Sequence, residues 1–148
     1  MNIERYNWDD INKYSKELVV YARSKKIDTI IGIARGGLPP AVIISNHLNC
    51  PMFTIGIKSY DDQERLCIET TQDLDYGLLD GNSILVVDDI CDSGKSLKYI
   101  KSNLDKNCKV KDVHTAALFL RDKSIFEPNI YSKKIIDDRW IIFPWEPK

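Results

Sequence analysis

Residues 84–97 read ILVVDDICDSGKSL, and this stretch decides the fold class. Its first four residues are apolar without polar alternation, which is typical of a strand covered on both faces of a parallel sheet. Carboxylates are unfavourable inside such a strand, so we expect it to end at Val87, with Asp88 and Asp89 at its carboxyl end. Open α/β sheets bind ligands at that edge, which makes the two acids candidate site residues.

The rest of the chain alternates apolar runs with helical patterns. Residue spacing predicts helices over about 9–26, 41–48 and 94–104, and strands over 29–33, 51–58, 84–87 and 113–120. This alternation predicts an α/β fold with a mostly parallel, twisted sheet flanked by helices. Residues 59–81 are acidic, contain Gln and are weakly patterned, so we expect a long loop there, functional or mobile.

Length and composition exclude several classes of protein. The 148 residues fit one domain that is able to bury a core. The 21 Lys plus Arg nearly balance 22 Asp plus Glu, and no basic stripe indicates a nucleic-acid partner. Cys50, Cys67, Cys91 and Cys108 are too far apart for a disulfide framework or zinc motif, so we expect free thiols. Without an apolar leader or membrane span, we expect a soluble cytoplasmic protein with no membrane partner.

Two strand-to-helix turns carry unusual residues. Small polar residues at 92–96 open a helix, where exposed N–H groups and the helix dipole favour an anion such as phosphate. The sequence GKS at 94–96 looks like the end of a Walker A motif, but that motif requires glycine where Asp89 stands, so an NTPase is excluded. An ordinary helix cap beside solvated acids remains the alternative for this turn.

The two turns resemble those of a known family. VVDDICDSGKS at 86–96 is similar to the phosphoribosyl pyrophosphate (PRPP) signature of type I phosphoribosyltransferases, in which a strand and two acids precede D-[ST]-G-x-[ST]. IGIARGGLPPA at 31–41 resembles the family's pyrophosphate loop. RWIIFPWE at 139–146, preceded by LFLR, resembles the bacterial xanthine-guanine branch. The resemblance extends over about 8–146.

The resemblance implies a PRPP site that works with Mg²⁺. Asp88 and Asp89 would hold the ribose hydroxyls and the metal, directly or through water. The implied 5′-phosphate ligands are Asp92, Ser93, Gly94, Lys95 and Ser96. The implied pyrophosphate ligands are Arg35, Gly36 and Gly37, after a non-proline cis peptide expected between Ala34 and Arg35.

The resemblance also implies a base site. Asp92 would accept a proton from the purine, with a plain phosphate-loop cap as the alternative. Trp140 would stack on the base and Ile141 would offer its backbone carbonyl, unless the C-terminal aromatics merely close the core. Arg121 stands where relatives usually carry a Lys that contacts the 6-oxo group, and Lys123 is the alternative for that task.

The implied protein is a purine salvage enzyme that acts on guanine, xanthine or hypoxanthine. Its core would span about 8–120 and a small C-terminal base-binding hood about 121–148, with a homodimer or tetramer as the implied assembly. Residues 59–71, beginning with Ser59 and Tyr60, match the family's mobile active-site loop in position, although a disordered connector is equally compatible. Two alternatives stay open: a regulatory protein of the same fold that binds PRPP or a nucleotide, and a phosphoribosyltransferase for another base.

Overall fold

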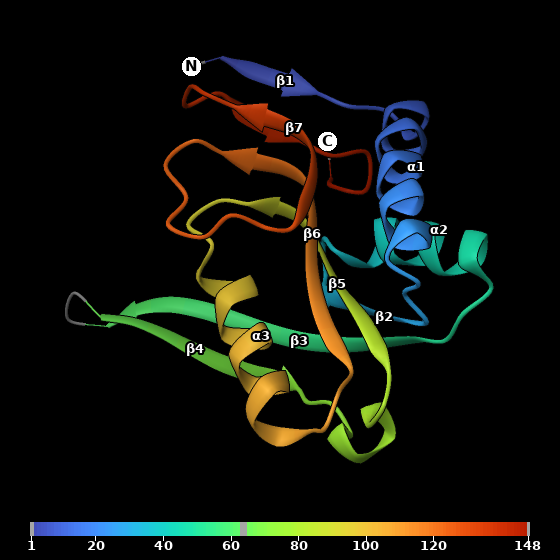
Figure 1. Cartoon of the computed structure of the whole chain (residues 1–148). Coiled ribbons are helices and arrows are strands. Elements are labelled where there is room, and N and C mark those ends of the chain that lie inside the picture. The colour runs from blue at the N-terminus through green and yellow to red at the C-terminus, as the bar shows by residue number, and fades with distance from the viewer. Residues whose placement is uncertain (1, 63–64, 148) are drawn as a thin grey trace.

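Strands and helices alternate through most of the chain (Figure 1). A computed structural model describes residues 2–62 and 65–147, and the side chains of 59–62 and 65–67 lie outside this description. In chain order the elements are β1 (Ile3–Arg5), α1 (Trp8–Ser24), β2 (Thr29–Ala34), α2 (Leu38–Leu48), β3 (Met52–Asp62), β4 (Arg65–Gln72), the 3-10 helix η1 (Tyr76–Leu79), β5 (Ser83–Cys91), α3 (Lys95–Asn107), β6 (Asp112–Arg121), β7 (Ile130–Ile135) and β8 (Trp140–Ile142).

The main sheet has six strands in the order β4-β3-β2-β5-β6-β7. Neighbouring strands are parallel except β3 and β4, which are antiparallel. Helices α1 and α2 cover one face of the sheet, and α3 covers the other (Figure 1). The α/β fold with a mostly parallel sheet flanked by helices, expected from the sequence, is confirmed.

The helices begin where the sequence supplies start signals. At the start of α1, the side chains and backbone N–H groups of Asn7 and Asp10 bond reciprocally, at 2.9 Å in both directions. Helix α2 starts directly after Gly37 with Pro39 and Pro40 in its first turn, where a missing N–H costs nothing. Both helices therefore form at the predicted positions in the chain.

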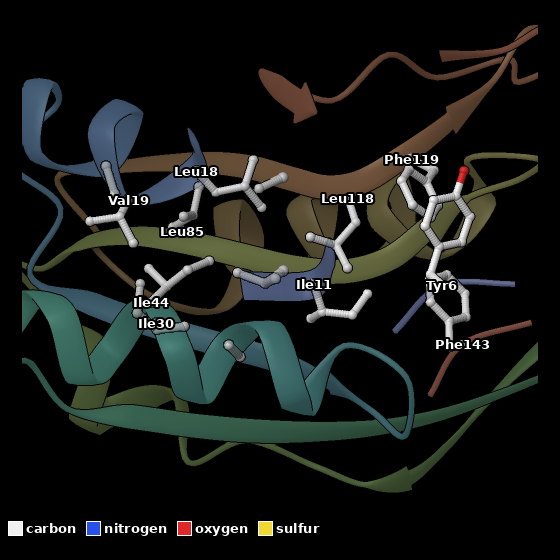
Figure 2. Packing of buried hydrophobic residues seen from close by; sticks show 14 of the residues in the cluster. Tyr6, Ile11, Leu18, Val19, Ile30, Ile44, Leu85, Leu118, Phe119 and Phe143 are labelled. Carbon is white, nitrogen blue, oxygen red and sulfur yellow. The ribbon is translucent and has the colours of Figure 1, made fainter. Parts of the chain in front are cut away.

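Helices α1 and α2 pack on the sheet through a continuous apolar layer (Figure 2). Leu18, Ile44 and Leu85 are fully buried in this layer. At one end, the ring of Phe119 lies 4.7 Å from Tyr6 and 5.7 Å from Phe143, measured between centroids. The core thereby continues into the two chain ends.

The order of the strands creates a switch point between β2 and β5. Pairing of β2 with β5 stops at Gly32 and Val87, whereas β5 continues beside β6 as far as Cys91. The expected strand end at Val87 is therefore wrong: Asp88 and Asp89 lie within β5. The strand accommodates them because from Asp88 onward it has a neighbour on one side only, which leaves an open crevice of the kind that binds ligands in such sheets.

The hood is a separate two-stranded sheet formed by the two ends of the chain. Strand β1 pairs in parallel with β8, so that Ile3 lies opposite Trp140 and Arg5 opposite Ile142. This hood differs from the segment expected at about 121–148. Strand β7 belongs to the main sheet, where it pairs with β6, and the partner of β8 in the hood is the N-terminal strand β1. The three-residue strands are too short to show a period in the sequence.

The long loop expected at 59–81 is also corrected. Strand β3 continues to Asp62, and β4 returns beside it as an antiparallel partner from Arg65 to Gln72. Ile68, Thr70 and Thr71 are β-branched residues, which favour a strand even where few residues are apolar. The η1 helix occupies much of what remains.

Two further expectations concern membrane-spanning helices and the cysteines. In the described ranges, no helix combines the length and apolar character that crossing a bilayer requires. Cys50, Cys91 and Cys108 are free thiols, as expected, and the side chain of Cys67 falls outside the described residues.

Candidate active site

The carboxylates of Asp88 and Asp89 lie at the switch point. The Oδ1 atom of Asp88 accepts the backbone N–H of Asp89 at 2.9 Å, and the Oδ1 atom of Asp89 accepts that of Ile90 at 2.7 Å. Burial raises the pKa of Asp88 well above its usual range, and the adjacent charge of Asp89 raises it further. Burial likewise raises the pKa of Asp89, to which the charge of Glu146 adds.

This acidic pair has the chemistry of a divalent cation site. Two half-buried carboxylates that repel one another are stabilised in their charged form by a nearby cation. No group of three or more His, Cys, Asp or Glu side chains in the described part of the chain forms a complete metal cage. Mg²⁺ commonly takes one or two carboxylates and completes its shell with water and substrate phosphate, so Asp88 and Asp89 fit this metal.

The turn after β2 packs directly against the acidic pair. The peptide bond between Ala34 and Arg35 is cis, as the resemblance implies. A Cβ atom at Gly36 would overlap the carboxylate of Asp89, and one at Gly37 would overlap the carbonyl oxygen of Val87. A side chain at Gly37 would collide with the backbone of β5, and one at Gly36 would displace the Asp89 carboxylate, so glycine suits both positions. The side chain of Arg35 is exposed beside them.

The turn after β5 forms a small polar pocket. Gly94 precedes α3 with a φ of 85°, a conformation that favours glycine. The Oγ atom of Ser93 accepts the backbone N–H of Lys95 at 3.3 Å. A cavity of about 160 Å³ at this helix start is lined by Asp88, Ile90, Cys91, Asp92, Ser93, Gly94, Ser96 and Leu97. The expected phosphate ligands line this cavity, apart from the exposed Lys95.

Residues 124–126 brace that turn from the far side. The backbone N–H of Ile125 donates to the carbonyl of Ser93 at 3.0 Å. A Cβ atom at Gly94 would come within 2.5 Å of the Cβ atom of Phe126 and 2.6 Å of the Oγ atom of Ser124. The turn is therefore held in a narrow slot between the strand end and this segment.

A second pocket lies between the strand ends and the hood. Its volume is about 170 Å³, and it is lined by Asp89, Ile90, Asp92, Arg121, Trp140, Ile141, Phe143 and Glu146. All three residues expected to bind a base, Arg121, Trp140 and Ile141, line this pocket. Trp140 is 57% exposed, which leaves its ring available to stack on a planar ligand.

Strand pairing in the hood orients the backbone of Ile141. The N–H of Trp140 donates to the carbonyl of Asn2 at 2.7 Å, and the carbonyl of Ile142 accepts from Tyr6 at 3.0 Å. Both residues therefore direct their backbone groups toward the N-terminal strand. Peptide groups alternate sides along a strand, so those of Ile141 point away from β1.

The two pockets share Ile90 and Asp92. The Oδ1 atom of Asp92 is 3.3 Å from Nε of Arg121 and 3.4 Å from Nζ of Lys123. Its carboxylate, 56% exposed, thus lies where the pockets meet and is flanked by two cations. A group placed there can act on ligands in both pockets.

Three residues of the second pocket were missed as site residues: Ile90, Phe143 and Glu146. The Oε2 atom of Glu146 accepts the backbone N–H of Phe143 at 2.9 Å, and the Phe143 ring stacks on Trp145 with centroids 4.6 Å apart. The PWE ending at 144–146 was the available signal, since it belongs to the motif that suggested the branch.

Two further regions complete the description. The backbone of Ser59 and Tyr60 belongs to β3, but their side chains lie outside the described residues, so the mobile-loop role stays a prediction. A larger cavity of about 350 Å³ lies between β1 and the C-terminal segment and shares Phe143 and Glu146 with the second pocket. The strand-end acids do not line it, so we place the chemistry at the smaller pair of pockets.

Comparison with known proteins agrees with this geometry. Residues 3–148 match the family model described as phosphoribosyl transferase domain. The chain is 31% identical over 147 residues to xanthine-guanine phosphoribosyltransferase of Cereibacter sphaeroides, covering 95% of this chain and 84% of the relative.

Solved structures give the same result over the whole chain. Purine phosphoribosyltransferase of Pyrococcus horikoshii is 30% identical with a TM-score of 0.89, covering 100% of this chain and 97% of that one. Xanthine-guanine-hypoxanthine phosphoribosyltransferase of Helicobacter pylori is 28% identical with a TM-score of 0.82, covering 98% and 94%. The paired pockets at the switch point and these similarities lead to one conclusion: the chain belongs to the phosphoribosyl transferase domain family, on its bacterial xanthine-guanine branch.

Proposed function

We propose that this protein makes purine 5′-monophosphates by transferring phosphoribosyl from PRPP to a 6-oxopurine, with release of pyrophosphate. The observation that carries the proposal is the junction of two pockets at Asp92, one polar at a helix start and one lined by aromatic rings. The names of the relatives, which act on xanthine, guanine and hypoxanthine or on purines, support the same substrate class.

PRPP occupies the switch-point side in this proposal. Its 5′-phosphate lies in the polar pocket, where backbone N–H groups and the hydroxyls of Ser93 and Ser96 serve as donors. Its pyrophosphate lies against Gly36 and Gly37, where the absence of side chains allows close approach and Arg35 supplies positive charge. Asp88 and Asp89 face the ribose between these two anion sites.

The proposal includes dependence on Mg²⁺. Asp88 and Asp89 would hold the ion, which when bound supplies positive charge to the departing pyrophosphate. The raised pKa values of the pair fit this arrangement, because no cationic side chain among the described residues forms an ion pair with either carboxylate. The protein's own contribution to this half of the site is a fixed cradle for anions.

The purine lies in the second pocket, stacked on Trp140 with its edge toward Ile141. During transfer, the bond from the anomeric carbon to the pyrophosphate oxygen breaks and a bond from that carbon to the ring nitrogen forms. The proton of that nitrogen passes to the Asp92 carboxylate, which reaches both pockets. Positive charge on the ribose is greatest between the breaking of its bond to pyrophosphate and the formation of its bond to the ring nitrogen. The flanking anions stabilise this charge.

Base choice follows from the charge around Asp92. Arg121 and Lys123 are cationic donors at this junction and match a 6-oxo acceptor. Adenine would place an amino donor against the cation that meets position 6, a mismatch that enzymes built to hydrogen-bond a substrate group discriminate strongly. We therefore expect adenine to be a poor substrate.

Other features of the proposal are the assembly and the setting. We propose a homodimer or tetramer in the cytoplasm, a compartment that suits the free thiols of Cys50, Cys91 and Cys108. A regulatory protein of the same fold would bind PRPP without turnover and would need a basic face for nucleic acid. The net charge of -1 offers little for such a face, and a phosphoribosyltransferase for another base would not need the hood aromatics.

A product assay tests the proposal. The protein is incubated with PRPP, Mg²⁺ and one nucleobase at a time, namely guanine, xanthine, hypoxanthine, adenine or orotate, and the nucleotide is measured by chromatography. We expect nucleotide from the three 6-oxopurines and loss of product when Mg²⁺ is chelated. Binding of PRPP without product from any base would favour the regulatory alternative, and efficient use of adenine or orotate would show that the base pocket is misassigned.

A further inference from the structure

The Arg121 guanidinium joins three separate segments at the end of β6. Its Nε atom lies 3.3 Å from the Asp92 carboxylate. Its Nη1 atom donates to the carbonyl of Asp137 at 3.1 Å, and its Nη2 atom donates to the carbonyl of Arg139 at 2.9 Å. Two nitrogens of this planar group therefore donate to backbone carbonyls and the third lies in an ion pair, and the side chain is only 12% exposed.

Lys123 provides an internal comparison. It approaches the same Asp92 oxygen at 3.4 Å but is 63% exposed. Its ammonium is a single point of charge on a flexible stem, whereas the guanidinium is a rigid fork. The two cations next to Asp92 thus differ in their geometry: one is fixed to the hood and the other extends into solvent.

The two carbonyls that accept from Arg121 belong to the turn that leads into β8. Within this turn, Asp137 binds the Arg139 side chain through Nε and Nη2, both at 2.7 Å. Arg139 also donates to Glu4 of β1 at 2.7 Å and directly precedes Trp140. Arg121 therefore fixes the backbone from which the exposed indole of Trp140 extends.

We propose that Arg121 is a positioning residue that holds Asp92 and the turn before Trp140 in one fixed arrangement, and that it does not read the purine. The inference rests on the proposed function, since Asp92 is its proton acceptor and Trp140 its stacking ring. If Arg121 contacted the 6-oxo group, it would have to use one of its two remaining N–H donors, whose directions are fixed by the bonds to the carbonyls of Asp137 and Arg139. The exposed Lys123 is the cation that can move to meet that group.

Kinetics of Arg121→Lys, with Lys123→Met as the matched variant, test the inference. A lysine keeps the charge beside Asp92 but lacks the fork that reaches both carbonyls. We expect Arg121→Lys to lower kcat about 10- to 100-fold, the cost of a misplaced catalytic group, for guanine, xanthine and hypoxanthine alike. The KM for PRPP should stay near that of the wild type. Lys123→Met should instead raise the KM for the purines and weaken discrimination against adenine.

A double variant separates positioning from general damage to the fold. If Arg121 acts through Asp92, then Arg121→Lys combined with Asp92→Asn should be no slower than Asp92→Asn alone. Multiplied losses in the double variant would mean that Arg121 acts independently of Asp92. Full activity of Arg121→Lys would contradict the positioning role, and loss of 6-oxo selectivity in this variant would identify Arg121 as the purine reader; either result would overturn the inference.

Hydrogen exchange gives a measurement that does not depend on turnover. Amides of residues 137–142 should exchange faster in Arg121→Lys than in the wild type, with the amides of β5 and β6 unchanged, and Lys123→Met should leave residues 137–142 protected. Equal exchange in all three proteins would contradict the positioning role. An inactive wild type in the product assay would refute the proposed function, and the exchange measurement would still decide whether Arg121 holds the turn.

Discussion

The strand-end turns and the hood are the two walls of the candidate active site, and they are built differently. The turns after β2 and β5 are continuous in sequence and depend on close backbone packing, since side chains at Gly36 or Gly94 would overlap their neighbours. The hood joins β1 and β8 from opposite ends of the chain. It is tied to the main sheet by charged side chains: Arg121 of β6 donates to the turn before β8, and Lys133 of β7 pairs with Glu4 of β1.

The different construction of the turns and of the hood suits two different tasks, the binding of anions and the recognition of a base. Anions need a rigid cradle of N–H groups, which a short glycine-containing turn provides without help from distant residues. A base is recognised by stacking and by a few polar groups, which the hood can change without altering the sheet. Asp92 belongs to the first wall but contacts cations near the second, so the proposed proton transfer depends on both.

The largest effect should come from the residue between the two walls. Asp92→Asn keeps the shape of the turn, but an amide does not accept the proton of the purine. We expect kcat to fall by about 10²- to 10⁴-fold, with little change in the affinity for PRPP. Steady-state kinetics beside calorimetric titration of PRPP measure both quantities. Turnover within a few-fold of the wild type would refute the role of Asp92.

The same contrast explains what could be predicted from the sequence. The strand-end turns were predicted from local order alone: an apolar strand, two acids and a small-residue helix start occur within 84–97. The placement of Asp88 and Asp89 at the ligand edge follows from that order. Only the end of β5 was predicted wrongly. The sequence does not reveal that β2 stops pairing with β5 after Val87.

The hood and β4 could not be predicted in the same way. Strands β1 and β8 have three residues each and are stabilised by a partner at the other end of the chain. Likewise, the two hydrogen bonds that Arg121 donates and its ion pair with Asp92 come from the tertiary structure, so its position in the motif alone suggested a purine contact. Strand β4 lies at a sheet edge and contains mostly polar or β-branched residues, which hides the apolar signal.

Glycine substitutions provide the next test, on the side of the turns. Gly94 and Gly81 have similar φ angles of 85° and 80°, but only Gly94 has neighbours within 4 Å of an added Cβ atom. Gly81→Ala should cost about 1 kcal/mol for its backbone conformation alone. Gly94→Ala should cost about 1–3 kcal/mol more, because Phe126 and Ser124 must move. Urea unfolding compares the two, and equal losses would mean that the brace at 124–126 is loose.

The smallest effect concerns the hood's ion pairs. Glu4 accepts from Arg139 at 2.7 Å and from Lys133 at 3.2 Å, and mainly the bond to Arg139 lowers the pKa of Glu4 from 4.5 to about 2. A lowered pKa means that this stabilisation is present above about pH 4.5 and is lost as the pH falls toward 2. Glu4→Gln should therefore lower the free energy of unfolding by about 1 kcal/mol at pH 7.

The pH series supplies the control for this prediction. The difference between Glu4→Gln and the wild type should shrink steadily below pH 4.5. Asp105→Asn, which breaks the exposed pair with Lys101 on α3, should cost no more than about 0.5 kcal/mol at any pH. A Glu4→Gln deficit that persists at pH 2 would show that the hood is held by packing alone.

The acidic pair allows the most direct test of the PRPP site. Burial raises the pKa values of Asp88 and Asp89, and the charges of Asp89 and Glu146 add to this for Asp88 and Asp89 respectively, so the ionised pair destabilises the fold as the pH rises through those values. The variant Asp88→Asn/Asp89→Asn removes this cost, and its Tm at pH 7 should equal or exceed that of the wild type, by roughly 2–4 °C. Loss of binding in this variant would then reflect the missing carboxylates and not unfolding.

Calorimetric titration of PRPP into the wild type and into Asp88→Asn/Asp89→Asn, each with Mg²⁺ and with a chelator, decides the central claim. Binding should be tight only to the wild type with Mg²⁺, and the folded double variant should show no measurable binding under either condition. Unchanged affinity in the double variant would contradict the assignment of the switch-point carboxylates to PRPP and its metal.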